Sequence, residues 1–276
     1  MDKATGVPYE YLRSSKKFPN VWCPGCGIGI VLGSIIRAVH SLGLSKDEVA
    51  MVSGIGCSGR MSVYPDFNTM HTTHGRALAF ATGLKLAKPN MKVLVVMGDG
   101  DAMAIGGNHF IHAARRNIGL TAIVINNSNY GLTGGQMSPT TPQGARTTTT
   151  WFGSIDPPFD ICRMAEAAGA SFVARSTAYH VLEMDKLIAR AIQKKGFSVV
   201  EAISQCPVYF GRHNNTPTAV EMLRWQRDNT VPASAADKDS VRGKIVRGLL
   251  LDRDQPEYSE EYFKLVDRLK APEGTQ

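Results

Sequence analysis

Two apolar runs lie close together in the middle of the chain and predict neighbouring buried strands. Residues 92–97 (KVLVVM) and 120–125 (LTAIVI) are almost entirely apolar, which is typical of strands covered on both faces of a parallel sheet. Residues 108–117 between them are predicted to form a short crossover helix. The unit is therefore a strand, a glycine-rich turn, a helix and a second strand.

Strands and helices are predicted to alternate along the chain as far as residue 203. The hydrophobic spacing predicts further strands at 49–53, 171–174 and 198–203, and helices at 28–42, 74–88, 159–168 and 181–194. Residues 61–73 show no regular pattern, and residues 138–158 are rich in Thr and Pro and predict a long functional loop. We therefore expect an α/β fold with a doubly wound parallel sheet and an arm formed by the first 22 residues.

The pattern becomes polar and balanced in charge after residue 210. Two helices are predicted in this part, at 219–228 and near 260–269. We therefore expect an α/β domain over residues 1–210 and a polar, helical C-terminal extension over residues 211–276.

Composition narrows the functional class. Hydrophobic residues make up 43% and charged residues 20% of the chain, which is typical of a globular protein with no segment that spans a membrane. The net charge of +7 lies in the first 210 residues, because residues 211–276 contain eleven basic and eleven acidic side chains. A basic face attracts nucleic acid, anionic substrates or an acidic protein. No nucleic-acid motif or Lys/Arg-rich run accompanies the charge, so we expect no nucleic acid.

The N-terminal residues and the cysteine count indicate a compartment. The first 20 residues lack the apolar stretch of a secretory signal, so we expect a cytoplasmic protein. Five cysteines in a reducing compartment are not expected to form a disulfide framework.

Polar side chains follow two of the predicted strands at the point where each strand ends. Gly98-Asp99-Gly100 follows the first strand and Asn126-Asn127 the second. Because the carboxyl ends of parallel strands meet at one edge of a sheet, Asp99 and Asn127 should be neighbours. A carboxylate, an amide oxygen and a backbone carbonyl suit Mg²⁺, and the glycines and the helix start suit a phosphate. The sequence therefore predicts a site for a magnesium diphosphate.

This pattern resembles the thiamine diphosphate motif, in which GDG is followed about thirty residues later by NN. In that family the metal is held by the motif Asp, the second Asn and the backbone carbonyl two residues beyond. The resemblance therefore implies Asp99, Asn127 and Asn129 as the magnesium ligands.

Four of the five cysteines lie in predicted loops at the ends of elements. These are Cys23, Cys26, Cys57 and Cys206, whereas Cys162 lies in a predicted helix and suits a buried structural thiol. Four loop thiolates suit either Zn²⁺ or a [4Fe–4S] cluster, and four unrelated buried cysteines are a third interpretation. The wide spacing argues mildly against a zinc ribbon.

Residues 8–210 resemble the β subunit of 2-oxoacid:ferredoxin oxidoreductases. The motifs CPGCG, GIGCS, GDG…NN, YGLTGGQ and CP occur in the same order and spacing. The resemblance implies that Cys23, Cys26, Cys57 and Cys206 bind one [4Fe–4S] cluster near the thiamine ring. Besides Gly98 and the metal ligands, the cofactor-binding positions that it implies are Ile55, Gly56, Cys57, Ser58, His74, Gly75, Arg76, Gly100, Asp101, Gly131 and Leu132.

The resemblance also implies a reaction and its partners. The reaction is the reversible, coenzyme A-dependent oxidative decarboxylation of a 2-oxoacid, with electrons passing through the cluster to ferredoxin. The stretch YGLTGGQ-x-SPTTP favours 2-oxoglutarate, with pyruvate or a branched-chain 2-oxoacid as the alternative. His74 and Arg76, and with less support Arg60, are candidate catalytic groups near the anionic substrate.

This chain is expected to supply only some of the residues of a thiamine diphosphate site. Thiamine enzymes need a glutamate from a second domain, and no such domain fits in this chain. We therefore expect a partner α subunit, in an α2β2 assembly, to supply it. The alternatives are a non-redox thiamine enzyme with a structural zinc site and a scaffold subunit without a cofactor.

Overall fold

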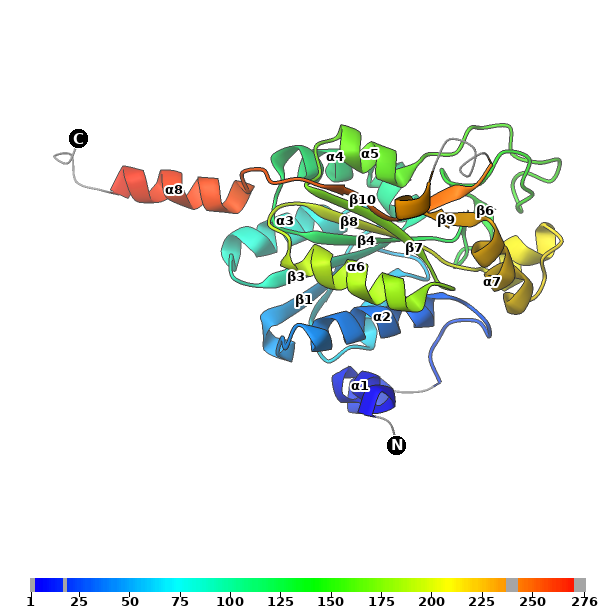
Figure 1. Cartoon of the computed structure of the whole chain (residues 1–276), viewed down its shortest axis with the longest axis horizontal. Helices are drawn as coiled ribbons and strands as arrows, with labels where there is room; N and C mark the ends of the chain where they lie inside the picture. Colours follow the sequence, from blue (N-terminus) through cyan, green and yellow to red (C-terminus); the bar gives the residue numbers. More distant parts are fainter. Residues whose placement is uncertain (1–2, 17–18, 237–242, 271–276) are drawn as a thin grey trace.

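In the computed structural model, an eight-stranded sheet lies between two layers of helices (Figure 1). Residues 3–16, 19–236 and 243–270 are described. The strands are β1 Val49–Ser53, β2 Asn68–His71, β3 Lys92–Gly98, β4 Thr121–Asn126, β5 Asn129–Tyr130, β6 Gln136–Met137, β7 Phe172–Thr177, β8 Ser198–Ile203, β9 Thr230–Pro232 and β10 Ile245–Asp252. The helices are α1 Lys3–Tyr11, α2 Ile28–Ser41, α3 Ala77–Ala87, α4 Gly107–Arg116, α5 Ile161–Ala167, α6 Val181–Gln193, α7 Ala219–Asp228 and α8 Tyr258–Lys270.

The strand order is β2-β1-β3-β4-β8-β7-β10-β9, and the first six of these strands are parallel to one another. Strand β10 runs antiparallel to β7, and β9 runs parallel to β10. The predicted doubly wound parallel sheet is therefore confirmed, with an added antiparallel strand. The carboxyl ends of β1, β3, β4 and β8 share one edge.

Alternate residues of the central strands pack into two separate cores. In β3, Leu94 and Val96 belong to the core beneath α2 and α6, whereas Val93 and Val95 belong to the core beneath α3, α4 and α5. Figure 1 shows these helices on opposite sides of the sheet. Because both faces are covered, the strand has no wet side, and this explains its unbroken apolar run.

Three predictions for the first half of the chain need correction. The N-terminal arm contains the helix α1, and the irregular stretch 61–73 contains β2, an edge strand that pairs with β1. The side chains of β2 are exposed or half-buried, so no hydrophobic alternation marked it. The helix predicted from residue 74 begins at Ala77, which leaves His74 in the turn before it.

The C-terminal segment contributes strands as well as the predicted helices. Helices α7 and α8 lie where they were expected, but β9 and β10 were missed. The side chains of β10 are half-buried along its length apart from exposed Asp252, so its pattern lacks the alternation of a strand with one wet face. Strand β10 joins this segment to the main sheet, and α8 projects away from the body (Figure 1). The predicted domain boundary at residue 210 remains a prediction.

The helices were compared with the length and hydrophobicity that a membrane-spanning helix needs. Among the residues that are described, every helix is too short or too polar to cross a bilayer.

An ion-pair cluster of buried Arg175 and Glu201 with partly exposed Asp160 links β7, β8 and the start of α5. The Arg175 guanidinium donates through Nε to Glu201 Oε2 (2.6 Å) and through Nη2 to Asp160 Oδ1 (2.6 Å). Asp160 Oδ1 also accepts the backbone N–H groups of Cys162 and Arg163 and so caps α5. Each charge in the cluster therefore has a partner of opposite sign or a hydrogen-bond donor.

We predict that Arg175→Met destabilises the fold by about 3–5 kcal/mol, because Glu201 would remain buried without its cation. Urea unfolding of the variant measures the change. Arg190→Met is the control, since Arg190 pairs with Asp252 at an exposed position and should change stability by no more than about 1 kcal/mol. Equal losses in the two variants would show that the buried pair has no special importance.

Candidate functional site

The carboxyl ends of β3 and β4 bring two polar residues into contact. Gly98 at the end of β3 pairs in register with Ile125 in β4. Asp99 follows Gly98 directly and Asn127 lies two residues beyond Ile125; the two lie side by side, with the Asn127 amide 3.2 Å from Asp99 Oδ1. The prediction that these two residues are neighbours is confirmed.

An oxygen cluster forms where Asp99 Oδ1, the Asn127 amide and the Asn129 carbonyl meet. One atom of the Asn127 amide faces both the Asn129 carbonyl oxygen (2.8 Å) and Asp99 Oδ1 (3.2 Å). The NH₂ group of the amide can donate to these acceptors, or the amide oxygen can take the same place beside a cation. A carboxylate, an amide oxygen and a carbonyl fit the oxygen-only shell of Mg²⁺. The residues present therefore fit this metal.

Asp99 is buried, and its two carboxylate oxygens have different surroundings. Oδ1 belongs to the oxygen cluster, whereas Oδ2 accepts the hydroxyl groups of Ser138 and Thr140, each at 2.5 Å. Burial raises the pKa of Asp99 to about 6, while the hydrogen bonds from the two hydroxyls act in the opposite direction. A bound dication would favour the ionised form.

Asp101 joins the segments that follow β1 and β2. Its Oδ1 accepts the N–H groups of Gly75 (2.7 Å) and Ile55 (3.4 Å), and it lies 2.7 Å from His74 Nδ1. Burial raises the pKa of Asp101, and the hydrogen bond from Gly75 opposes the rise. Ile55, His74 and Gly75 are therefore held together at the edge where Asp99 lies.

The chain enters a helix directly after β3, without the open turn that was predicted. Asp101–Ile105 forms a π-helical turn that leads into α4, and such turns are frequent at functional sites. Gly100 lacks a side chain because a Cβ there would lie 2.2 Å from the ring of Tyr130.

The other predicted cofactor positions lie around the same edge, with one exposed exception. A Cβ on Gly131 would lie 3.3 Å from Asn129 Oδ1 and 3.4 Å from Cys57 Sγ, so this glycine separates the oxygen cluster from a thiol. Ser58 is buried with its hydroxyl facing Gly98, and Gly56 adopts a positive φ of 96°. Leu132 is the exception and is 48% exposed.

Arg76 is anchored rather than free. Its Nη1 donates to the carbonyl oxygens of Ile105 (3.1 Å) and Gly75 (3.4 Å). Arg60, in contrast, is exposed, and its charge acts on Cys57.

The four loop thiols, Cys23, Cys26, Cys57 and Cys206, come together from three parts of the chain. Gly27 N–H donates to the Gln205 carbonyl and Gln205 Nε2 donates to the Gly25 carbonyl, which fastens the CxxC loop beside Cys206. Trp22 Nε1 donates to the Cys57 carbonyl (2.7 Å) and brings in the third part.

The loop thiols are close enough to affect one another's charge. Burial raises the pKa of Cys26 to about 12 and that of Cys57 to about 11, and repulsion from the neighbouring cysteines adds to both shifts. We compared the distances between side-chain atoms that can bind a metal. Among the described residues, only Asp160, Cys162 and Glu201 form a group of three whose ligand atoms all lie within 4.8 Å of one another. No three of the loop thiols are that close.

Cys162 lies apart from the loop thiols, as its predicted helical position indicated. It is buried in α5 and its thiol donates to Glu201 Oε2 (3.3 Å) within the ion-pair cluster. The Arg175 guanidinium pairs with both Asp160 and Glu201, so the grouping of Cys162 with these carboxylates is explained by an ion-pair cluster.

Sequence reasoning missed the hydroxyl groups of Ser138 and Thr140 at Asp99. The stretch SPTT was assigned to a long loop, and 138–158 does contain no helix or extended strand. Two hydroxyl residues in a loop after Asn126-Asn127 give only a weak sequence signal for this contact. Their spacing does not identify the carboxylate that they bond to.

Known proteins are similar to this chain in sequence. Residues 51–202 match the family model of the thiamine pyrophosphate enzyme C-terminal TPP-binding domain. The 2-oxoglutarate synthase subunit KorB of Archaeoglobus fulgidus is 62% identical over 261 residues, which cover 95% of this chain and 93% of that protein. KorB of Methanothermobacter thermautotrophicus is 48% identical over 270 residues, which cover 97% and 94% of the two chains. The chain belongs to the family of 2-oxoacid:ferredoxin oxidoreductase β subunits.

A solved member of this β-subunit family has the same fold. The 2-oxoglutarate:ferredoxin oxidoreductase from Magnetococcus marinus, solved with 2-oxoglutarate, coenzyme A and succinyl-CoA bound, matches with a TM-score of 0.86 at 35% identity. The match covers 98% of this chain and 92% of that one. The chain is therefore an oxidoreductase subunit with a thiamine diphosphate-binding domain.

We predict that Gly54→Ala lowers stability by about 1–3 kcal/mol, the range for overpacking a buried site. A Cβ there would lie 1.8 Å from Asp101 Oδ2 and displace the carboxylate that joins Ile55, His74 and Gly75. Thermal unfolding measures the effect. Gly83→Ala in α3 is the control, because nothing lies within 4 Å of its Cβ and the change should stabilise the helix by up to about 1 kcal/mol. An unchanged melting temperature for Gly54→Ala would contradict this prediction.

Proposed function

We propose that the chain is the cofactor-binding β subunit of a 2-oxoglutarate:ferredoxin oxidoreductase. With a partner α subunit, it converts 2-oxoglutarate and coenzyme A into succinyl-CoA and CO₂ and passes two electrons to ferredoxin, in a reversible reaction. The observation that carries the proposal is the oxygen cluster around Asp99 beside the thiol of Cys57, with Gly131 between them. The names of the relatives and the ligands of the Magnetococcus marinus enzyme support 2-oxoglutarate over pyruvate or a branched-chain 2-oxoacid.

Asp99, Asn127 and Asn129 are the residues that would hold Mg²⁺ and, through it, the diphosphate. Their three oxygens would supply part of the metal's oxygen shell, with phosphate oxygens and water as the remaining ligands. When bound, thiamine diphosphate supplies the nucleophilic carbon and the electron sink for decarboxylation of a 2-oxoacid. The protein fixes the cofactor and excludes water from the buried side of the metal.

The spread of the loop thiols supports a [4Fe–4S] cluster over zinc. A tetrahedral zinc ion with Zn–S distances of about 2.3 Å holds its sulfurs about 3.8 Å apart, whereas no three of these thiols lie within 4.8 Å of one another. In a cluster each cysteine binds a different iron, so the sulfurs lie farther apart. The pKa values of Cys26 and Cys57 are raised, so these thiols stay protonated without a metal. Positive metal ions beside the four cysteines would stabilise their thiolate forms.

Of the two predicted catalytic residues, His74 and Arg76, His74 is the better placed. Its Nδ1 contacts Asp101 Oδ1, and its ring lies edge-on to Tyr130 at 6.4 Å between centroids. With Nδ1 facing the Asp101 carboxylate, Nε2 is left to face the substrate and accept a hydrogen bond from it. Arg76, held by two carbonyls, supplies a fixed positive charge to the anionic 2-oxoacid.

A partner α subunit completes the site. Thiamine enzymes require a glutamate beside the cofactor, and both buried glutamates among the described residues are engaged elsewhere. Glu201 pairs with Arg175, and Glu257 accepts the Gly119 N–H group. We propose an α2β2 assembly in which the α subunit supplies this glutamate, and the basic first 210 residues attract acidic ferredoxin.

We predict that Asp99→Ala weakens binding of Mg²⁺-thiamine diphosphate at least about 100-fold, because loss of outer-shell partners alone costs ten- to hundredfold. Calorimetric titration of the complex with its partner subunit measures this. Asp156→Ala, at an exposed position in the long loop, is the matched control and should bind the cofactor normally. Normal cofactor affinity in Asp99→Ala would remove Asp99 from the metal shell.

We also predict that anaerobically purified protein contains iron and sulfide, and that replacing any of the four loop thiols by Ala removes them. Cys162→Ala should keep the iron and lose about 1 kcal/mol of stability, as for a small buried hydrophobe. Metal analysis is the readout. Zinc in place of iron would overturn the cluster, and iron loss in Cys162→Ala with retention in Cys206→Ala would overturn the choice of ligands.

A further inference from the structure

The carboxylate of Asp99 is held on one side by hydroxyl groups and faces the oxygen cluster on the other. The Oδ2 atom accepts Ser138 Oγ and Thr140 Oγ1, both at 2.5 Å, which is the distance expected for hydroxyl groups that donate to an ionised oxygen. The Oδ1 atom accepts neither hydroxyl and lies 3.2 Å from the Asn127 amide. The two hydroxyls therefore set the rotation of the carboxylate.

The two hydroxyls are themselves fixed by a tight turn. The Ser138 N–H group donates to Thr141 Oγ1 (2.9 Å), and the Thr141 N–H group donates back to the Ser138 carbonyl (3.1 Å). The Thr141 hydroxyl then donates to the Ser128 carbonyl (2.7 Å), which follows β4. The turn is thereby fastened to the strand end that carries Asn127.

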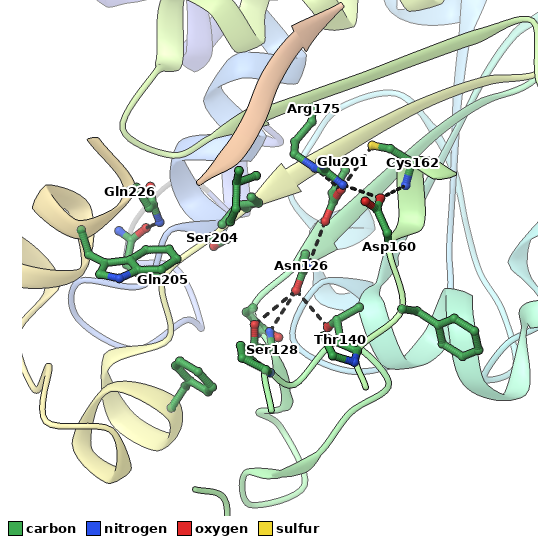
Figure 2. Close-up of a pocket in the computed structure, with 18 of the residues that line it drawn as sticks. Asn126, Ser128, Thr140, Asp160, Cys162, Arg175, Glu201, Ser204, Gln205 and Gln226 are labelled. Carbon is green, nitrogen blue, oxygen red and sulfur yellow. Dashed lines mark hydrogen bonds and ion pairs between the residues drawn. The ribbon is translucent and has the colours of Figure 1, made fainter. Parts of the chain in front are cut away.

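Asn126 connects the turn to Glu201 of the ion-pair cluster. Figure 2 shows Asn126 between Thr140 and Glu201 on the wall of a cavity of about 790 Å³. The Asn126 Nδ2 donates to Glu201 Oε1 (2.8 Å), and its Oδ1 lies 3.0 Å from Thr140 Oγ1. The single Thr140 proton has two acceptors, Asp99 Oδ2 at 2.5 Å and Asn126 Oδ1 at 3.0 Å, and the shorter contact to a carboxylate favours Asp99.

We propose that Ser138 and Thr140 are positioning residues that select the metal. By occupying Asp99 Oδ2 they restrict the carboxylate to ligation through Oδ1 alone, and this restriction favours Mg²⁺ over Ca²⁺. The inference rests on the proposed function, in that it assumes a divalent cation at the oxygen cluster.

The reason lies in the different geometry of the two ions. Mg²⁺ requires a near-octahedral shell at about 2.0–2.1 Å, which suits one oxygen from each carboxylate. Ca²⁺ accepts about 6–8 ligands at about 2.3–2.6 Å and readily takes both oxygens of one carboxylate. Removing the hydroxyls frees Oδ2 and so gives Ca²⁺ a ligand that it lacks in the native site.

The test measures thiamine diphosphate binding by calorimetry, first with Mg²⁺ and then with Ca²⁺ as the sole divalent cation. It uses the full chain in complex with its partner subunit. The variants are Thr140→Val, Ser138→Ala and the double variant. Thr140→Ser keeps the hydroxyl, and Thr147→Val removes a buried hydroxyl of the same long loop that bonds to Thr150 and not to Asp99, so both serve as controls.

We expect the ratio of Mg²⁺-supported to Ca²⁺-supported affinity to fall about tenfold in Thr140→Val and further in the double variant, because each lost bond is made to a charged group. The ratio should be unchanged in Thr140→Ser and Thr147→Val. A purely structural role would weaken binding equally with both ions. That result, or an unchanged ratio in Thr140→Val, overturns the proposal.

The same experiment separates this inference from the proposed function. If the wild-type complex binds thiamine diphosphate with neither ion, the proposed function fails. If the wild type binds it and the ion ratio is the same in all variants, only the positioning role of Ser138 and Thr140 fails. The single variants guard against loss of the turn in the double variant, and far-UV circular dichroism checks that each one is folded.

Discussion

The burial of one carboxylate, Asp99, at the end of β3 is the constraint on which the rest of the site depends. A carboxylate with 2% of its surface exposed needs hydrogen bonds or a cation, and here Oδ2 receives two hydroxyls while Oδ1 is left among acceptor groups. The Asn127 amide can turn its NH₂ group toward Oδ1, and the backbone N–H groups of Asp99 and Gly100 add hydrogen bonds to the carboxylate. The buried edge is thus prepared for a dication, and the loop that contains Ser138 and Thr140 is held in place by the same carboxylate.

The parallel sheet explains why the cofactor site and the thiols are neighbours. Loops after β1, β3, β4 and β8 all leave the same edge, so Cys57, Asp99, Asn127 and Cys206 meet there although they are far apart in sequence. The C-terminal strand β10 lies on the far side of β7 and adds an antiparallel neighbour to the sheet. The proposed electron transfer from a thiamine ring to an iron–sulfur cluster would require such proximity, and the topology provides it within one chain.

The sequence predicts those strands and contacts that follow from the local pattern of apolar and polar residues. Strands β3 and β4 were recognisable because both faces are covered, and the contact of Asp99 with Asn127 followed from their parallel pairing. Strands β2 and β10 were not recognisable, because their exposed or half-buried side chains show neither an apolar run nor a strict alternation. The bond between Thr140 and Asp99 joins residues 41 positions apart through a loop without periodicity, so only the folded chain reveals it.

The central claim is that this chain carries the cofactor half of a 2-oxoglutarate-oxidising enzyme and needs its partner to act. The direct measurement is anaerobic reduction of ferredoxin by the purified subunits, separately and together, with a panel of 2-oxoacids and with or without coenzyme A. The account predicts reduction only when both subunits, coenzyme A and 2-oxoglutarate are present, with slower rates for pyruvate and branched-chain 2-oxoacids. Reduction by this chain alone, or decarboxylation of 2-oxoglutarate without any reduction of ferredoxin, would contradict it.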